Sequence, residues 1–343
     1  MTLSAHGNVR AMNRPKANAS HPYDRLSPDV VVAAVEGVGF VPDGRLLALN
    51  SYENRVYQVG MEQGPPLIAK FYRPNRWTTE AILEEHAFAL ELAAAEVPVV
   101  PPLQRDSHSL FEHEGFRFAL FERRGGHWPE LGTEQEREWM GRFIGRIHAL
   151  GRRRPFVHRA ELTIERLGDE PREWLLDEGW IPDHLLDAYE SVSDDLLESV
   201  EAQFAAAGNV AQIRLHGDCH PGNVLWTDAG PHFVDLDDCM RGPAIQDLWM
   251  LLSGNRREMG EQLSHLLQGY RQFADFDYNE LHLVEALRSL RIMHYAGWLA
   301  RRWDDPAFPL AFPWFAEPRY WEQHVLNLRE QLSALQEGPL SVA

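Results

Sequence analysis

The chain has 343 residues, of which 44% are hydrophobic and 24% charged, and its formal net charge is −18. This length suggests about two domains, and the composition is that of a folded globular protein. The acidic balance argues against nucleic acid as a partner, because phosphate backbones attract basic surfaces. We expect no membrane span, since the apolar runs are far shorter than the roughly 18 residues that a spanning helix needs.

Residues 1–23 are predicted to form a disordered tail, and this stretch lacks the apolar core of a secretory signal. The two cysteines, Cys219 and Cys239, provide no disulfide framework, which is typical of proteins in a reducing cytoplasm. We therefore expect a cytoplasmic monomer with no nucleic-acid or membrane partner.

Residues 24–122 are predicted to form a lobe that is rich in strands and has one helix. The predicted strands are Asn54–Val59, Leu67–Tyr72, Val97–Leu103 and Phe116–Phe121. The helix is predicted over Thr79–Ala95, because Ile82, Ala89 and Leu92 recur at helical spacing, and Thr79 is expected to cap its start.

Residues 123–132, which include a double arginine and a double glycine, are predicted to form a hinge. Beyond it, residues 133–343 are predicted to be mainly helical, with helices over Glu134–Leu150, 182–207 and 279–303. Ile213–Asp238 is an exception that predicts a β-hairpin carrying acids and amides. The order of elements predicts a bilobal α+β fold with a β-rich first lobe and a helical second lobe.

The loop before this hairpin, His216–Asn223, has the sequence HGDCHPGN. Phosphoryl transfer needs a carboxylate that accepts the proton of the attacking hydroxyl, and metal ions held by hard oxygen ligands. Asp218 is the candidate base, and the amide oxygen of Asn223, five residues on, is a candidate metal ligand. Taken singly, each is an ordinary turn-forming residue.

Twelve residues after Asn223, an apolar strand ends in carboxylates, with the sequence FVDLDD. Strand alternation predicts Asp235 and Asp237 on the same face, so that Asp235 chelates magnesium and contributes to catalysis while Asp237 assists. A zinc site built from His216, Asp218 and His220 is the alternative, but it leaves Asn223 and the carboxylates without a role. The ordered set therefore favours magnesium.

Only Lys16 and Lys70 are lysines among the 33 basic residues, and Lys70 lies in an apolar strand. A buried ammonium is costly unless it is paired or binds an anion, so Lys70 is predicted to pair with Glu85 and to hold phosphates. The alternative is that Lys70 extends to the surface. Ser51 lies in a turn without glycine where a phosphate-covering loop is expected.

Asp247 begins an apolar helix after the hairpin, and its carboxylate is expected to accept backbone N–H groups of the catalytic loop. The alternative is a helix-start residue favoured by the macrodipole. Cys219, beside Asp218, is interpreted as a small buried residue rather than a redox switch. The tryptophan-rich segment Trp298–Phe315 fits either a partner surface or a core.

These motifs resemble the aminoglycoside phosphotransferase and choline kinase branch of the protein-kinase-like superfamily. Within it, the strings NSYENRVYQV, KFYRPNRW, ILEEHAFALEL, RLHGDCHPGNVLW, FVDLDD, GPAIQDLWMLL and RRWDDPAFP resemble a family of bacterial stress-response serine/threonine protein kinases, over about residues 24–336. The turn around Ser51 has no glycine, unlike ordinary protein kinases, but it agrees with this family.

The resemblance implies ATP and Mg²⁺ as cofactors, Asp218 as proton acceptor, and Asn223 and Asp235 as metal ligands. It also implies that Ser51 lies at the ATP site and that Lys70, paired with Glu85, holds the phosphates. The implied substrates are serine and threonine hydroxyls of proteins, with autophosphorylation, in a stress response. A small-molecule kinase of the same fold and a nucleotide-binding scaffold without activity are the alternatives.

Overall fold

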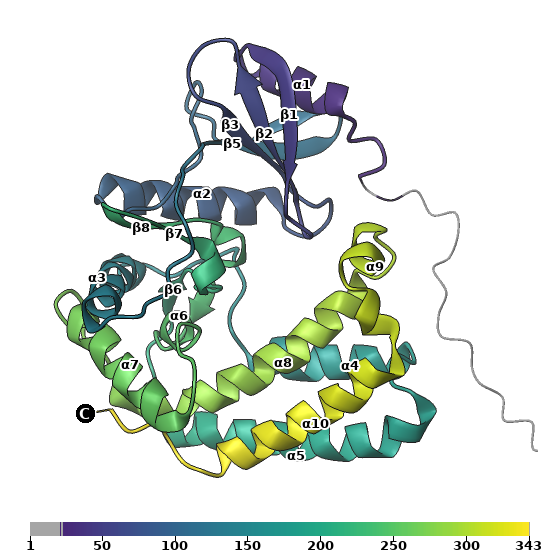
Figure 1. Cartoon of the computed structure of the whole chain (residues 1–343), viewed down its shortest axis with the longest axis vertical. Coiled ribbons are helices and arrows are strands. Elements are labelled where there is room, and N and C mark those ends of the chain that lie inside the picture. Colours follow the sequence, from purple (N-terminus) through teal and green to yellow (C-terminus); the bar gives the residue numbers. More distant parts are fainter. Residues whose placement is uncertain (1–20, 22, 343) are drawn as a thin grey trace, which may run out of the picture. The chain divides into compact units, whose positions relative to one another are not determined.

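The computed structural model describes residue 21 and residues 23–342 (Figure 1). The predicted tail therefore lies, except for His21 and Tyr23, outside the described residues. The described chain forms two compact units. One holds 163–202 and 288–337 with His21, and the other holds 23–162, 203–287 and 338–342. Every predicted site residue belongs to the second unit, whereas the predicted lobe boundaries stay a prediction.

The second unit begins with a five-stranded antiparallel sheet of order β1-β2-β3-β5-β4. Its strands are β1 (Pro42–Leu49), β2 (Arg55–Met61), β3 (Leu67–Phe71), β4 (Phe111–His113) and β5 (Phe116–Glu122). Two helices accompany it, α1 (Pro28–Gly37) and α2 (Thr79–Ala94). The predicted strands at 54–59, 67–72 and 116–121 are thus confirmed to within two residues.

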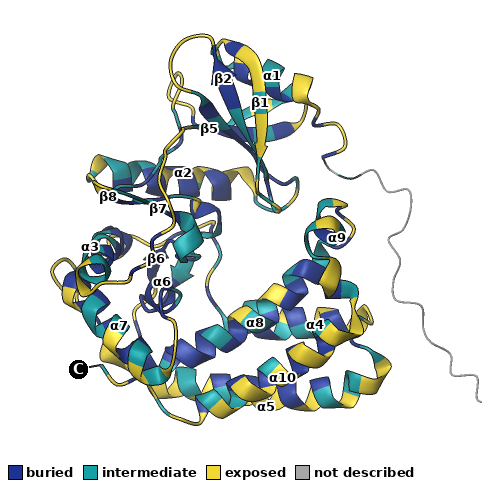
Figure 2. Ribbon diagram, in the orientation of Figure 1, coloured by how far each residue is buried: buried dark blue, intermediate teal, exposed yellow. Residues whose placement is uncertain are grey.

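The two faces of this sheet have different partners. Val31, Ala34 and Val35 of α1 pack with Ala69, Phe71 and their neighbours, whereas Ile82 of α2 packs with Tyr72 and Ala119. Because side chains alternate along a strand, Lys70, between Ala69 and Phe71, points to the α2 face. Figure 2 shows the buried residues concentrated in the sheet and along α2.

Two expectations for this region were wrong. The cap of α2 is Thr78, whose hydroxyl accepts the N–H of Ala81 at 3.2 Å, one residue before the predicted Thr79. The segment Val97–Leu103 is not a continuous strand but makes isolated bridges, from Val99 to Phe233 and from Pro102 to Phe121. It contains three prolines, which cannot donate to a β-ladder.

The remainder of this unit carries helices and two small antiparallel pairs. The helices are α3 (Glu134–Gly151), α6 (Gln246–Trp249) and α7 (Arg256–Tyr270), and the pairs are β6 (Ile213–Leu215) with β9 (Met240–Gly242) and β7 (Val224–Thr227) with β8 (Gly230–Phe233). Helices α3 and α7 approach so closely that α3 needs a glycine at position 141: a Cβ there would lie 1.9 Å from the carbonyl oxygen of Leu266. The predicted helix 134–150 and the hairpin are confirmed.

The first unit is built from helices around an aromatic core. They are α4 (Glu170–Asp177), α9 (Ala307–Ala311), α10 (Pro318–Leu335) and most of α5 (Leu186–Ala207) and α8 (Leu283–Arg301). In the tryptophan-rich segment, Phe308 and Phe315 are fully buried and Trp303 is 8% exposed, whereas Trp314 is 40% and Leu310 83% exposed, so the segment contributes to both core and surface.

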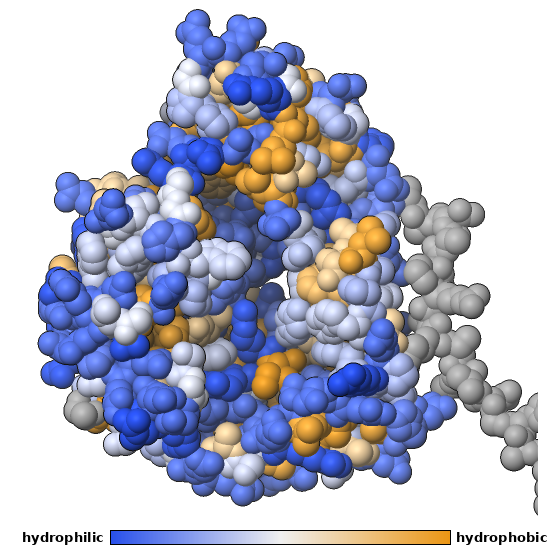
Figure 3. All heavy atoms as spheres, viewed as in Figure 1, coloured by the Kyte–Doolittle hydropathy of each residue, from blue (hydrophilic) through white to orange (hydrophobic). Residues whose placement is uncertain are grey.

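None of the helices in the described part of the chain is long and apolar enough to cross a bilayer. Hydrophilic residues predominate on the face drawn in Figure 3, which agrees with the strong net charge.

Candidate active site

The loop after β6 is held from beneath by Asp247, at the start of α6. The two carboxylate oxygens of Asp247 accept the backbone N–H groups of His216 and Gly217, each at 2.8 Å. His148 of α3 lies 2.9 Å from the same carboxylate through its Nε2. Asp247 is only 1% exposed, and these three contacts compensate its burial. The predicted role of Asp247 is confirmed, whereas no pattern in the sequence pointed to His148.

Gly217 makes this loop possible. Its φ is +86°, and a Cβ there would lie 2.2 Å from the carbonyl oxygen of Asp238. A side chain at this position would be strained and would push the catalytic loop away from the turn that carries Asp238. His216 is buried, and its Nε2 lies 2.9 Å from the carbonyl oxygen of Val234, which ties the loop to the segment after β8.

Asp218 and Asn223 meet as the sequence predicts. The Asn223 amide nitrogen donates to the Asp218 carbonyl oxygen at 2.9 Å and to its carboxylate at 3.2 Å. The amide oxygen therefore points away from Asp218 and is the atom suited to bind a cation. His220 Nδ1 accepts the N–H of Gly222 at 2.9 Å, and its Nε2 lies 3.4 Å from the Asp218 carboxylate.

The second acidic segment is not the extended strand end that alternation predicted. Strand β8 ends at Phe233, Asp235 has left-handed dihedral angles (φ 58°, ψ 64°), and Leu236–Asp238 form a 3-10 turn. The regular alternation of side chains therefore stops before Asp235, and Asp235 and Asp237 do not lie on one face of a strand. The Asp235 side chain is 52% exposed and that of Asp237 is 4% exposed.

Lys70 is the point where β3 meets these acids. Its Nζ lies 2.8 Å from Asp235, 3.2 Å from Asp237 and 3.8 Å from Glu85 of α2. The predicted contact with Glu85 is present, but the two aspartates are nearer. Burial opposes the charge of Lys70, yet these three carboxylates outweigh it and raise its pKa. The ammonium is therefore charged and does not extend to the surface.

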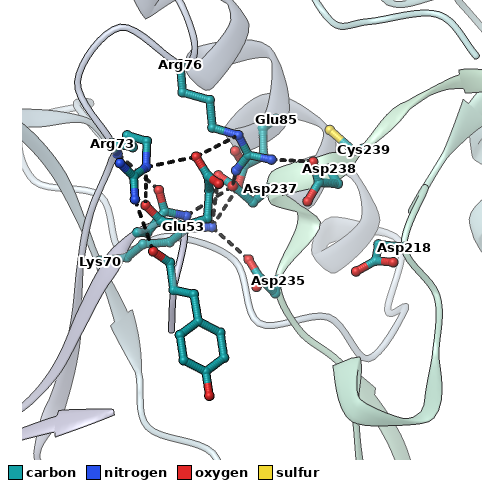
Figure 4. A network of polar contacts seen from close by, with 12 residues as sticks. Glu53, Lys70, Arg73, Arg76, Glu85, Asp218, Asp235, Asp237, Asp238 and Cys239 are labelled. Atoms are coloured by element: carbon teal, nitrogen blue, oxygen red, sulfur yellow. Dashed lines mark hydrogen bonds and ion pairs between the residues drawn. The ribbon is translucent and has the colours of Figure 1, made fainter. Parts of the chain in front are cut away.

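Arginines extend the network around Lys70 (Figure 4). Arg76, in the loop between β3 and α2, forms ion pairs with Asp237 and Asp238, and Arg73 lies 3.0 Å from Glu53. Burial opposes the charge of Arg76, but the neighbouring carboxylates raise its pKa. Burial would also raise the pKa of Asp237, but Lys70, Arg76 and Arg159 hold it below its usual range.

The turn between β1 and β2, which contains Ser51, enters this network through the residues that follow Ser51. The carbonyl oxygens of Tyr52 and Glu53 accept hydrogen bonds from Arg73, and Asn54 donates to Asp237 at 3.0 Å. Ser51 itself is half-buried, one residue before these contacts. Its place at the ATP site stays a prediction.

Helix α2 is fixed to the helical part of this unit by a second glutamate. The Glu84 carboxylate accepts the N–H groups of Val157 at 2.7 Å, His158 at 2.7 Å and Arg159 at 2.8 Å. Glu91, further along α2, pairs with Arg214 at 2.9 Å. The Glu84 carboxylate is thus engaged with the backbone of residues 157–159. These contacts fix the helix that carries Glu85.

The predicted hinge, residues 123–132, pairs with β7 through His127. His127 and Trp226 exchange backbone hydrogen bonds of 3.1 and 2.7 Å. A pocket of about 270 Å³ lies beside this contact, lined by His127, Pro129, Glu130, Leu131, Glu136 and Trp226. The connection places the hinge directly beside the hairpin that follows Asn223.

The donors fit magnesium better than zinc. Asn223 and Asp235 offer an amide and a carboxylate oxygen, the hard ligands that Mg²⁺ takes together with phosphates and water. Among the residues that the structure describes, no three His, Cys, Asp or Glu side chains converge as a metal site requires. Cys219 is fully buried, as interpreted.

Comparisons with known proteins identify the family of the chain. A model of the phosphotransferase enzyme family matches residues 45–284. Stress response kinase A of Escherichia coli (strain K12) is 44% identical over 325 residues, covering 95% of this chain and 98% of that protein. Serine/threonine protein kinase RdoA of Salmonella typhimurium is 43% identical over 320 residues, covering 93% and 97%.

Solved structures show the same fold at low identity. Amicoumacin kinase hAmiN, in complex with AMP-PNP, Ca²⁺ and Ami, has a TM-score of 0.68 and 20% identity, covering 89% of this chain and 93% of that one. Choline kinase from Cryptosporidium parvum has a TM-score of 0.61 and 12% identity, covering 91% and 97%. The predicted protein-kinase-like α+β fold is confirmed.

Proposed function

Because the chain belongs to the phosphotransferase enzyme family, we propose that it is an ATP- and Mg²⁺-dependent serine/threonine protein kinase. The observation that carries the proposal is the meeting of Lys70 with Asp235, at 2.8 Å, beside a loop whose Asp218 and Asn223 are in contact. The Salmonella typhimurium relative, which is named a serine/threonine protein kinase and is 43% identical over 93% of this chain, supports the choice of protein as acceptor.

In this proposal the chain's residues divide the work of a direct transfer. The acceptor hydroxyl oxygen forms a bond to the γ-phosphorus, the bond from that phosphorus to the ADP oxygen breaks, and Asp218 takes the hydroxyl proton. Asn223 and Asp235 hold Mg²⁺, which neutralises charge on the phosphates. Lys70, anchored by Glu85, binds the phosphates, and Ser51 lies at the nucleotide.

Autophosphorylation, a cytoplasmic location and a role in stress response belong to the same proposal. They rest on the sequence resemblance and on the name of the relatives. The catalytic residues do not distinguish a protein acceptor from a small molecule, because a small-molecule kinase would use the same ones.

The test is to incubate the purified chain with ATP labelled at the γ-phosphate, together with myelin basic protein or a panel of small alcohols. We expect label on serine and threonine of the protein acceptor and of the chain itself, identified by mass spectrometry, and at least about 100-fold less label with Asp218→Asn. Transfer to a small alcohol alone would replace the protein acceptor in the proposal. Nucleotide binding without any transfer would support the scaffold alternative.

A further inference from the structure

One buried carboxylate, Asp237, joins several parts of the site. Its Oδ1 lies 3.2 Å from Lys70 Nζ, and its Oδ2 accepts a hydrogen bond from Asn54 Nδ2 at 3.0 Å and pairs with Arg76. Its carbonyl oxygen accepts a hydrogen bond from Arg159, in the loop after α3. Figure 4 shows Asp237 between Lys70 and Arg76, with Asp235 on the other side of Lys70. Asp237 thus connects β3, the turn before β2 and two further loops.

Asp235 and Asp237 have opposite surroundings. Asp235 is half-exposed, as a ligand that must reach a nucleotide-bound metal requires, whereas the Asp237 side chain is 4% exposed. Its Oδ2 is engaged by Asn54 and Arg76, and its Oδ1 lies in an ion pair with Lys70 at 3.2 Å. A buried charge of this kind is retained when its partners compensate its desolvation. The sequence-based expectation that Asp237 assists Asp235 on the metal does not account for these contacts.

We propose that Asp237 is a positioning residue, which holds Lys70 and the glycine-free turn in place for the nucleotide phosphates and does not bind the metal. This inference rests on the proposed function. If Asp235 held Mg²⁺, Lys70 would still have two carboxylate partners, Asp237 at 3.2 Å and Glu85 at 3.8 Å. Asp237 would then keep the ammonium in the site.

The turn at residues 50–54 gives the proposal a second support. Asn54 is 3% exposed, and its side chain donates to Asp237 and accepts the N–H of Arg73 at 3.1 Å. Glu53 lies 3.0 Å from Arg73 and 3.6 Å from Arg76. Side-chain contacts therefore fix this turn before a nucleotide binds, and a turn ordered in advance loses less entropy on binding.

The test compares Asp237→Asn with Asp235→Asn in nucleotide binding, measured by titration calorimetry with ATP, first in EDTA and then over a range of Mg²⁺ concentrations. We expect Asp237→Asn to weaken ATP binding in EDTA by about tenfold, as for the loss of one charge-assisted contact. The Mg²⁺ concentration that gives half of the increase in ATP affinity (the Mg²⁺ midpoint) should stay within about twofold of the wild-type value, since the metal ligands are intact. Asp235→Asn should instead raise that concentration. Asp228→Asn, in the exposed turn between β7 and β8, is the control for the chemical change.

A rise in the Mg²⁺ requirement of Asp237→Asn equal to that of Asp235→Asn would make Asp237 a metal ligand and overturn the inference. So would unchanged ATP binding in EDTA. If Asp237→Asn does not fold, Asn54→Ala removes the neutral partner of the same carboxylate, and it should weaken ATP binding without moving the Mg²⁺ midpoint. Unchanged binding in Asn54→Ala would then contradict the inference. None of these measurements requires phosphoryl transfer, so failure of the proposed kinase activity would be seen separately.

Discussion

Asp247→Asn tests how the catalytic loop is supported. The asparagine has one acceptor oxygen where the carboxylate has two, and its NH₂ group would face a backbone N–H of His216 or Gly217, now 2.8 Å from a carboxylate oxygen. A hydrogen bond to a charged group contributes about 1.5–3 kcal/mol, and a buried donor without a partner costs about 1–3 kcal/mol. We therefore expect the free energy of unfolding to fall by about 2–4 kcal/mol.

The same change should lower turnover more than it changes the KM for ATP. The loop carries Asp218 and Asn223, and a misplacement of about 1 Å in a catalytic group costs roughly 100-fold in rate. Urea denaturation followed by tryptophan fluorescence measures the first effect, and steady-state transfer of labelled phosphate measures the second. Asp275→Asn, at an exposed position, is the control. Wild-type stability together with turnover within twofold of wild type would refute this account of the loop.

Further outcomes follow from other contacts. Glu84→Ala removes the acceptor of three backbone N–H groups and should lower the free energy of unfolding by about 1–3 kcal/mol, measured by urea denaturation, whereas Glu198→Ala, at an exposed helical position, should change it little. Burial raises the pKa of Glu280 to about 7, so the folded state binds a proton more tightly than the unfolded chain, and the stability from this group is lost as pH rises from about 4.5 to 7. Glu280→Gln should flatten that pH dependence and be the more stable protein at pH 8; an unchanged slope would contradict the assignment. Asn223→Ala should raise the Mg²⁺ concentration needed for half-maximal transfer, and a loss of rate that no Mg²⁺ concentration alters would argue against ligation.

Elements with a strong local pattern were predictable from the sequence. Strands β2, β3 and β5 and helices α2 and α3 lie where alternation or helical spacing places them. The predicted support of the catalytic loop by Asp247 was also correct, since spacing and helix position are local properties. Helix α1 and strand β1 were not predicted, although Ser27 followed by Pro28 is a recognisable helix start.

The errors arose where a local rule met a longer-range constraint. The alternating sequence pattern predicted a strand that continues through Asp237. In the structure, β8 ends at Phe233 and Asp235 adopts a left-handed conformation. The arginines of the network gave no separate signal, because almost every basic residue in this chain is an arginine. Arg76 meets Asp237 across 161 residues of sequence, and such a pair follows only from the folded chain.

The most direct test of the proposed mechanism is the turnover of Asp218→Asn. The substitution keeps the size of the side chain and its contact with Asn223 but removes the proton acceptor. We predict that turnover falls by about 10²–10⁴-fold, the usual contribution of a positioned general base. ATP binding should remain close to that of the wild type. Phosphoryl transfer at the wild-type rate in this variant would contradict the assignment of Asp218 and the mechanism built on it.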